Sequence, residues 1–192
     1  MDTYHVVLYL HVLFLLVGVG AASIIWVCLL NLRAAQTLAD AGPWGALAGK
    51  IEKVFPVVIL GLFGTGAYMT NDVWTWSTGW IDVSIAALVV IAVQGAGIAG
   101  ARAHALKHAL MANGPGPLGE QARRMARDPV LWIASFANPA LVLGVVWNMT
   151  QKPSTGSAIA AVVVAEVVGA AVALRFTRPP SVEAAKAPEP AG

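Results

Sequence analysis

The sequence predicts an all-α fold, a membrane-embedded bundle of five transmembrane helices. Hydrophobic residues make up 58% of the 192 residues and charged residues only 11%, whereas a soluble domain carries about 25% charge. Five apolar stretches are long enough, or nearly so, to cross a bilayer, and basic residues gather between alternate stretches. These three observations exclude an ordinary soluble domain and a disordered chain.

The five spans are predicted from the length of helix, about 20 apolar residues, that crosses roughly 30 Å of hydrocarbon. They cover residues 4–32, 51–69, 81–101, 129–149 and 156–174. After the third span the chain should stay helical as far as Ala112, break at NGPGPLG and continue as a short basic helix. Residues 1–176 thus form one transmembrane domain, and the Pro- and Ala-rich residues 177–192 are expected to be a disordered cytoplasmic tail.

The distribution of basic residues predicts the orientation. All of the 12 Lys and Arg residues except Lys152 fall on one predicted side of the membrane. The positive-inside rule makes that side cytoplasmic, which places the N-terminus outside and the C-terminus in the cytoplasm. The opposite loop contains Trp74, Trp76 and Trp80, as in an interfacial aromatic belt. We therefore expect a multi-pass protein of the bacterial inner membrane.

Small residues and prolines predict how the spans pack. Membrane helices approach one another through small side chains, and the first span presents Gly18 and Ala22 on one face. Pro56 and Pro139 interrupt the second and fourth spans. Each proline frees a backbone carbonyl that a nearby group must satisfy. The bilayer is the expected partner, and the net charge of +2 argues against nucleic acid. A membrane-protein partner or a homo-oligomer remains open.

His11 is the leading candidate for a cofactor site. Gly18 and Ala22 lie within about 20° of its direction on a helix, so His11 should point into the bundle near the outer boundary. His5, about 120° away, is a second candidate metal ligand nearer the surface. Met69 and Met149 end the second and fourth spans on the same side.

Imidazole and thioether groups bind haem iron or Cu(I). A pair formed by His11 with Met69 or Met149 is therefore one hypothesis for this region. The alternative is an interfacial histidine that is hydrogen-bonded to a neighbouring helix. His104 and His108 share a helical face at the cytoplasmic side, but no third ligand is evident there, so a wet amphipathic extension is the simpler interpretation.

A second candidate site lies deeper in the membrane. Glu166 is a carboxyl group within an apolar span, so it should face the bundle or carry a proton. Gln94, Asn138 and Glu166 fall at similar depths, about 10–14 Å above the cytoplasmic boundary at 1.5 Å per residue. This polar cluster either relays a proton or an ion or provides interhelical hydrogen bonds.

Three segments, YLHVLFLLVGVGA, KIEKVFPVVILGLFGTGAYM and WNMTQKP, resemble a bacterial integral-membrane family known as domain of unknown function 2269. The resemblance covers about residues 4–175 and implies a helical bundle without an established activity. More distantly, the LHV segment looks like the first-helix histidine of copper-resistance D-type membrane proteins and of HemJ-type protoporphyrinogen oxidases. That likeness implies that His11 is a haem or copper ligand.

Two functional hypotheses result. In the first, the protein binds haem b or copper near its outer face through His11. In the second, it is a transporter-like or accessory membrane subunit whose cluster at Glu166 relays a proton or an ion. The sequence contains no nucleotide-binding loop, nucleophile elbow or HExxH motif, and its single cysteine, Cys28, excludes an internal disulfide. Whether the protein is an enzyme is left open.

Overall fold

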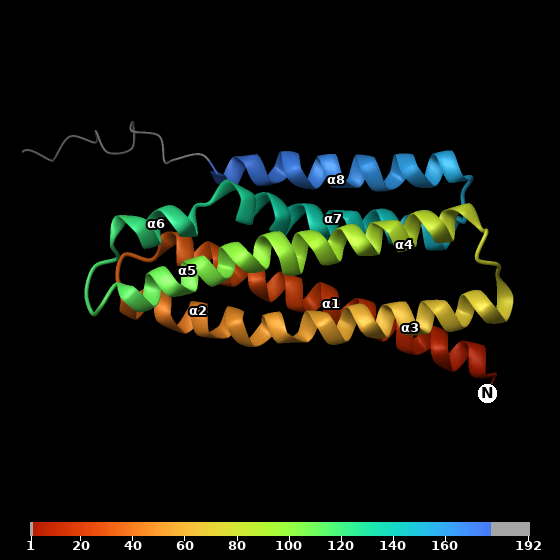
Figure 1. The fold of residues 1–192 in the computed structure, drawn as a ribbon, viewed down its shortest axis with the longest axis horizontal. Helices are drawn as coiled ribbons and strands as arrows, with labels where there is room; N and C mark the ends of the chain where they lie inside the picture. Colours follow the sequence, from red (N-terminus) through yellow and green to blue (C-terminus); the bar gives the residue numbers. More distant parts are fainter. Residues whose placement is uncertain (1, 178–192) are drawn as a thin grey trace, which may run out of the picture.

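The computed structural model describes residues 2–177, which form an all-α bundle (Figure 1). Apart from an isolated bridge between Thr37 and Pro117, these residues contain no β-structure. The elements are α1 (Thr3–Ala34), α2 (Leu38–Ile51), a 3-10 turn η1 (Glu52–Val54), α3 (Phe55–Val73), α4 (Gly79–Ala92), a π-helical segment η2 (Val93–Ala99), α5 (Gly100–Ala112), α6 (Glu120–Ala126), α7 (Pro129–Gln151) and α8 (Thr155–Thr177).

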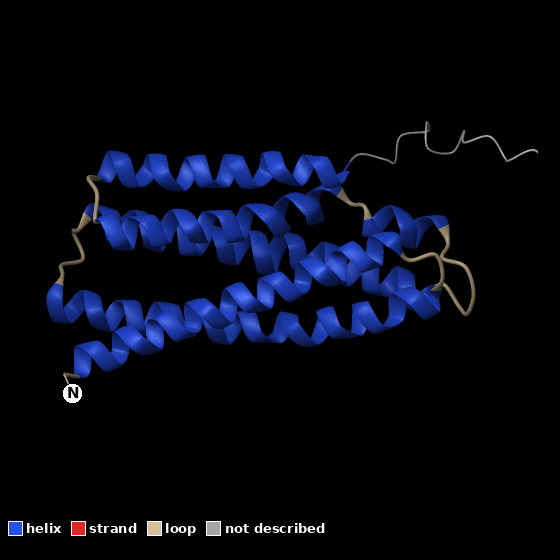
Figure 2. Ribbon diagram, turned by 180° about the vertical axis from the view of Figure 1, so that it is seen from behind, coloured by secondary structure: helices blue, strands red, loops and turns tan. Residues whose placement is uncertain are grey.

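The chain runs back and forth along the long axis of the bundle, and its connections gather at two ends (Figures 1 and 2). The N-terminus, the α3–α4 loop and the α7–α8 loop lie at one end, which we call the tryptophan end because the α3–α4 loop and the start of α4 contain Trp74, Trp76 and Trp80. The α1–α2 and α5–α6 connections lie at the other, basic end, with Arg33, Lys107 and other basic residues.

Four helical segments are long and apolar enough to cross a membrane: Thr3–Ala34, Gly79–Ala112, Glu120–Gln151 and Thr155–Thr177. They contain four of the five predicted spans, and the remaining one, residues 51–69, corresponds to η1 and most of α3. Large apolar side chains of α8 face outward, including Val163, Val164, Val167 and Val168. Such an apolar surface suits lipid rather than water, as expected of a multi-pass membrane protein.

The segments beyond the spans match the expected boundaries where the structure describes them. α5 ends at Ala112, and the break that follows has Gly114 and Gly116 at positive φ. The short helix α6 then carries Arg123 and Arg124 in its last turn. The expected disordered tail, residues 177–192, lies outside the described residues except for Thr177, which ends α8.

Glycines allow the helices to approach closely, as predicted for α1. A Cβ atom added to Gly18 would lie 2.9 Å from a methyl group of Val58 on α3. On α8, a Cβ atom at Gly169 would lie 2.8 Å from the Cα atom of Ala137 on α7. Since real Cβ contacts are longer than this, a larger residue at either position would push two helices apart.

The structure shows which groups satisfy the carbonyls that the two prolines free. Within α7, Pro139 cannot donate to the Ser135 carbonyl four residues earlier. The indole Nε1 of Trp26, on α1, donates to that oxygen instead, at 2.7 Å. Pro56 lies at the start of α3, and the Glu52 carbonyl accepts an N–H three residues later through the 3-10 turn η1. The predicted need for substitute donors is confirmed at both prolines.

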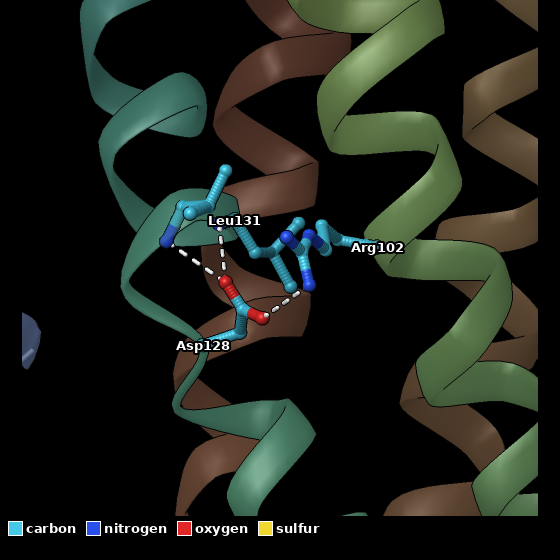
Figure 3. A network of polar contacts seen from close by, with 4 residues as sticks. Arg102, Asp128 and Leu131 are labelled. Carbon is cyan, nitrogen blue, oxygen red and sulfur yellow. Dashed lines mark hydrogen bonds and ion pairs between the residues drawn. The ribbon is translucent and has the colours of Figure 1, made fainter.

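Asp128 joins two helices at the basic end (Figure 3). Its Oδ1 atom accepts the backbone N–H groups of Val130 at 2.8 Å and Leu131 at 3.2 Å, so it caps the N-terminus of α7. Its Oδ2 atom lies 3.4 Å from the Arg102 guanidinium of α5. Because the same carboxylate caps α7 and pairs with Arg102, it fixes the register of α5 against the first turn of α7.

Candidate functional site

A cavity of about 330 Å³ lies between α1, α3, α4 and α7 in the half of the bundle nearer the tryptophan end. Its wall is mostly apolar, and three tryptophans and Lys152 stand on the tryptophan-end side of it. Sites for small molecules and cofactors are typically apolar cavities of about 300–1,000 Å³ with a few polar groups. The groups able to bind a metal here are His11, Met69 and Met149.

His11 is buried, with 6% of its surface exposed, and it packs against α3 as its glycine-containing face predicted. Its Nδ1 atom lies 2.7 Å from the Thr65 hydroxyl, and that hydroxyl donates to the Gly61 carbonyl at 2.6 Å. Gly66 leaves room for the ring, because a Cβ atom at this position would lie 3.6 Å from the imidazole Cε1 atom.

This chain of hydrogen bonds is compatible with a neutral His11 that carries its proton on Nδ1. When the single hydroxyl proton of Thr65 is donated to the Gly61 carbonyl, which is its shortest contact, the Thr65 oxygen accepts from Nδ1–H. The Nε2 atom then carries the lone pair. An imidazole whose other nitrogen donates to a fixed acceptor is the form in which histidine binds metals.

The two methionines reach the same cavity from different helices. Met69 comes from the last turns of α3, and Met149 from the last turn of α7. The structure thus brings together the three residues that the sequence singled out as candidate cofactor ligands. Their role as ligands stays a prediction.

His5, the other candidate metal ligand, does not line the cavity. It lies on the exposed first turn of α1, where its Nδ1 atom is 3.4 Å from Asp2 Oδ2. Within residues 2–177, no group of three or more His, Cys, Asp or Glu side chains could hold a metal ion. A metal in the cavity would therefore depend on His11 and on thioether ligands.

Lys152 is a cavity residue that sequence reasoning did not select. It caps α7 in the left-handed conformation, at φ 50° and ψ 52°, and it is the one non-glycine residue with positive φ in the described chain. This position usually holds glycine or asparagine. The ammonium Nζ atom lies 4.7 Å from the Trp74 ring centroid. The sequence did contain one signal for it, because Lys152 is the one Lys or Arg residue on its predicted side of the membrane.

The second candidate site lies further from the tryptophan end. Gln94 Nε2 donates to Glu166 Oε1 at 2.7 Å, which joins η2 to α8. Asn138 of α7 lies beside the same turn, because a Cβ atom at Gly95 would be 3.3 Å from Asn138 Nδ2. The structure therefore places a direct bond within the proposed cluster and an amide next to it.

The histidine pair at the basic end is bonded to itself. The Nε2 atoms of His104 and His108 lie 2.9 Å apart on the exposed face of α5. Because one ring donates to the other, each ring satisfies a polar atom of its neighbour. This arrangement fits the solvent-exposed amphipathic extension of the third span that the sequence favoured.

Comparisons of this chain with protein-family models, with curated proteins and with solved structures find no match. The resemblance to the family of unknown function therefore stays a prediction, and the site has to be interpreted from its own geometry.

Proposed function

We propose that this protein is a five-span protein of the bacterial inner membrane that binds haem b or copper near its outer face through His11. In this arrangement α3 is the fifth span and the tryptophan end faces outward. α3 supports this role because its 19 residues pack antiparallel to α1, and 19 helical residues extend about 28 Å. The gathering of Lys and Arg at the opposite end supports the orientation.

The observation that carries the proposal is the hydrogen-bonded chain from His11 through Thr65 to the Gly61 carbonyl. It is compatible with a neutral imidazole that has its lone pair on Nε2, at the wall of an apolar cavity. Second-shell donors and acceptors of this kind fix the tautomer and orientation of metal-binding histidines. A histidine that served only to join two helices would not need a cavity beside it.

The donor set fits the two cofactors in different ways. One imidazole with one or two thioethers is a soft ligand set, which suits Cu(I). Imidazole with one thioether also suits haem iron, and Lys152 at the cavity wall would pair with an acidic substituent of the macrocycle. Either cofactor would supply one-electron redox chemistry when bound. Met69 and Met149 are the candidate partners of His11 in both cases.

The test is an absorption spectrum and an elemental analysis of the protein purified from membranes. The proposal expects either a Soret band or stoichiometric copper. His11→Ala should remove most of the cofactor, and His5→Ala, a matched change about 1.7 turns away on the same helix, should retain it. A folded wild-type protein supplied with haem and with copper that binds neither would refute the proposal.

Thr65→Val tests the hydrogen-bonded chain itself. Valine keeps the shape of threonine but cannot accept the Nδ1 proton of His11. Loss of a second-shell partner typically lowers metal affinity about 10–100-fold, so cofactor occupancy should fall in competition with a chelator or with apomyoglobin. Equal affinity in wild type and Thr65→Val would show that the tautomer argument is wrong.

A further inference from the structure

We propose that Gln94, Asn138 and Glu166 form a cation site, separate from the His11 cavity, at which a proton and Na⁺ compete for the Glu166 carboxylate. The inference goes beyond the proposed cofactor function and does not depend on it. It is based on three buried oxygens without a hydrogen-bond partner among the described residues, the charged groups around the cluster and the position of the cavity above it.

Three of the four side-chain oxygens of the cluster have no hydrogen-bond partner in the described part of the chain. Gln94 Nε2 satisfies Glu166 Oε1, but three buried oxygens have no partner within residues 2–177: Gln94 Oε1, Asn138 Oδ1 and Glu166 Oε2. A buried polar atom left unsatisfied costs about 1–3 kcal/mol. Three such acceptors on segments that pack against α7 or belong to it indicate that a donor or a positive charge belongs among them.

No basic side chain supplies that charge. Glu166 takes part in none of the ion pairs of the described residues. Of the elements packed against α8, α7 carries no titratable group and α4 carries only Asp82 in its first turn. The η2 segment, bonded to Glu166 through Gln94, carries none either. On α8 itself Arg175 is nine residues away, about 13 Å along the helix. An ionised Glu166 would therefore need an ion from outside the protein.

The ligand chemistry favours a monovalent hard cation. The available groups are carboxylate and amide oxygens, which prefer hard cations to transition metals. One carboxylate balances a single positive charge, whereas Ca²⁺ takes 6–8 oxygen ligands and Mg²⁺ needs an octahedral set. The exchange balances as Glu166–COOH plus Na⁺ giving Glu166–COO⁻·Na⁺ plus H⁺. In the protonated state, Oε2–H donates to one of the neighbouring amide oxygens.

The cavity offers a route to this site. Among its deepest wall residues are Ile91 on α4 and Val142 on α7. Gln94 follows Ile91 by three residues, and Asn138 precedes Val142 by four, so each lies about one helical turn further from the tryptophan end. The π-helical turn of η2 interrupts regular α-helix at this depth, and such turns are frequent at functional sites. A cation entering from the tryptophan end would meet the cluster directly below the cavity.

The experiment is calorimetric titration of NaCl into the full-length purified protein, with choline chloride as the control for ionic strength. Repeating it in buffers of different ionisation enthalpy measures the protons released. The proposal expects saturable Na⁺ binding with release of up to one proton, and an apparent Kd that weakens about tenfold for each pH unit below the titration of the carboxyl group. Absence of saturable Na⁺ binding, or binding without any proton release across pH, would overturn it.

Variants assign the binding to these residues. Glu166→Gln should abolish Na⁺ binding, and Asn138→Ala should weaken it at least tenfold, which keeps the test informative if Glu166→Gln fails to fold. Glu52→Gln, a carboxyl change in η1 at the basic end of the bundle, should leave Na⁺ binding unchanged. His11→Ala should also leave it unchanged, so loss of the cofactor and loss of the cation are separable. Unaltered Na⁺ binding in both Glu166→Gln and Asn138→Ala would refute the assignment.

Discussion

The hydrogen bond from Trp26 to the Ser135 carbonyl gives the sharpest test of the packing described above. Trp26→Phe removes the indole donor, which lies 2.7 Å from that oxygen. Phenylalanine keeps an aromatic ring to stack on Phe136, where the two rings now lie 4.9 Å apart at 17°. Because Pro139 has no amide hydrogen, no backbone group of α7 replaces the lost donor.

The size of the effect depends on the Ser135 carbonyl, which loses its hydrogen-bond donor in Trp26→Phe. An unsatisfied buried acceptor costs about 1–3 kcal/mol, whereas hydrogen bonds between membrane helices average about 0.6 kcal/mol. We therefore expect Trp26→Phe to lower the free energy of unfolding by about 1 kcal/mol. Pro139→Ala restores an amide to α7, and that amide can donate to Ser135. In the Pro139→Ala background Trp26→Phe should cost close to nothing.

The assay is a double-mutant cycle of unfolding in mixed detergent and sodium dodecyl sulfate micelles, followed by helical circular dichroism. The predicted coupling between Trp26 and Pro139 is about 1 kcal/mol. The control is Trp147→Phe, since Trp147 is 54% exposed and makes no hydrogen bond through its indole within residues 2–177. If Trp26→Phe cost the same with and without Pro139, the indole would not be compensating for the proline.

The remaining predictions concern topology and α2. With Cys28 replaced, cysteine at Ser77 should react with an impermeant thiol reagent outside intact cells, and cysteine at Asn113 should react only after lysis; the reverse pattern would invert the orientation. Thr37→Ala removes the capping box of α2, so amide exchange in that helix should quicken about fivefold, equivalent to about 1 kcal/mol. Hydrogen bonds from Thr37 lower the pKa of Asp40, so its contribution to α2 should be complete above about pH 4 and be lost as the pH falls through the lowered pKa. Protection factors in α2, corrected for the intrinsic pH dependence of amide exchange, that did not change between pH 5 and pH 2 would contradict this.

The features that depend on local chemistry were predictable from the sequence. The apolar stretches fix where the long helices lie, and Pro139 requires a substitute donor whatever its neighbours are. His11 was expected to face the bundle because Gly18 and Ala22 share its helical face, and the structure buries it against α3. In each case the sequence of a single helix is enough to predict the feature.

Features that depend on contacts between helices were not predictable. Neither Trp26 as the donor to α7 nor Thr65 as the partner of His11 follows from spacing, because both depend on how two helices are rotated against each other. The π-helical segment η2 has no turn signal beyond its glycines. The left-handed Lys152 also departs from the usual preference for glycine at a helix end, so the tertiary structure overrides local preference there.

The position of the cavity follows from how the helices pair. α1 packs mainly on α3, and α7 mainly on α8, whereas α3 and α4 touch only slightly. The cavity lies along this weak contact, and the candidate ligands come from both sides of it: His11 and Met69 from α1 and α3, and Met149 from α7. A ligand bound by all three would connect two helix pairs that have little direct contact of their own. Its binding free energy would therefore contribute to the association of the pairs, and its removal would weaken the contact between the α1–α3 pair and the α7–α8 pair.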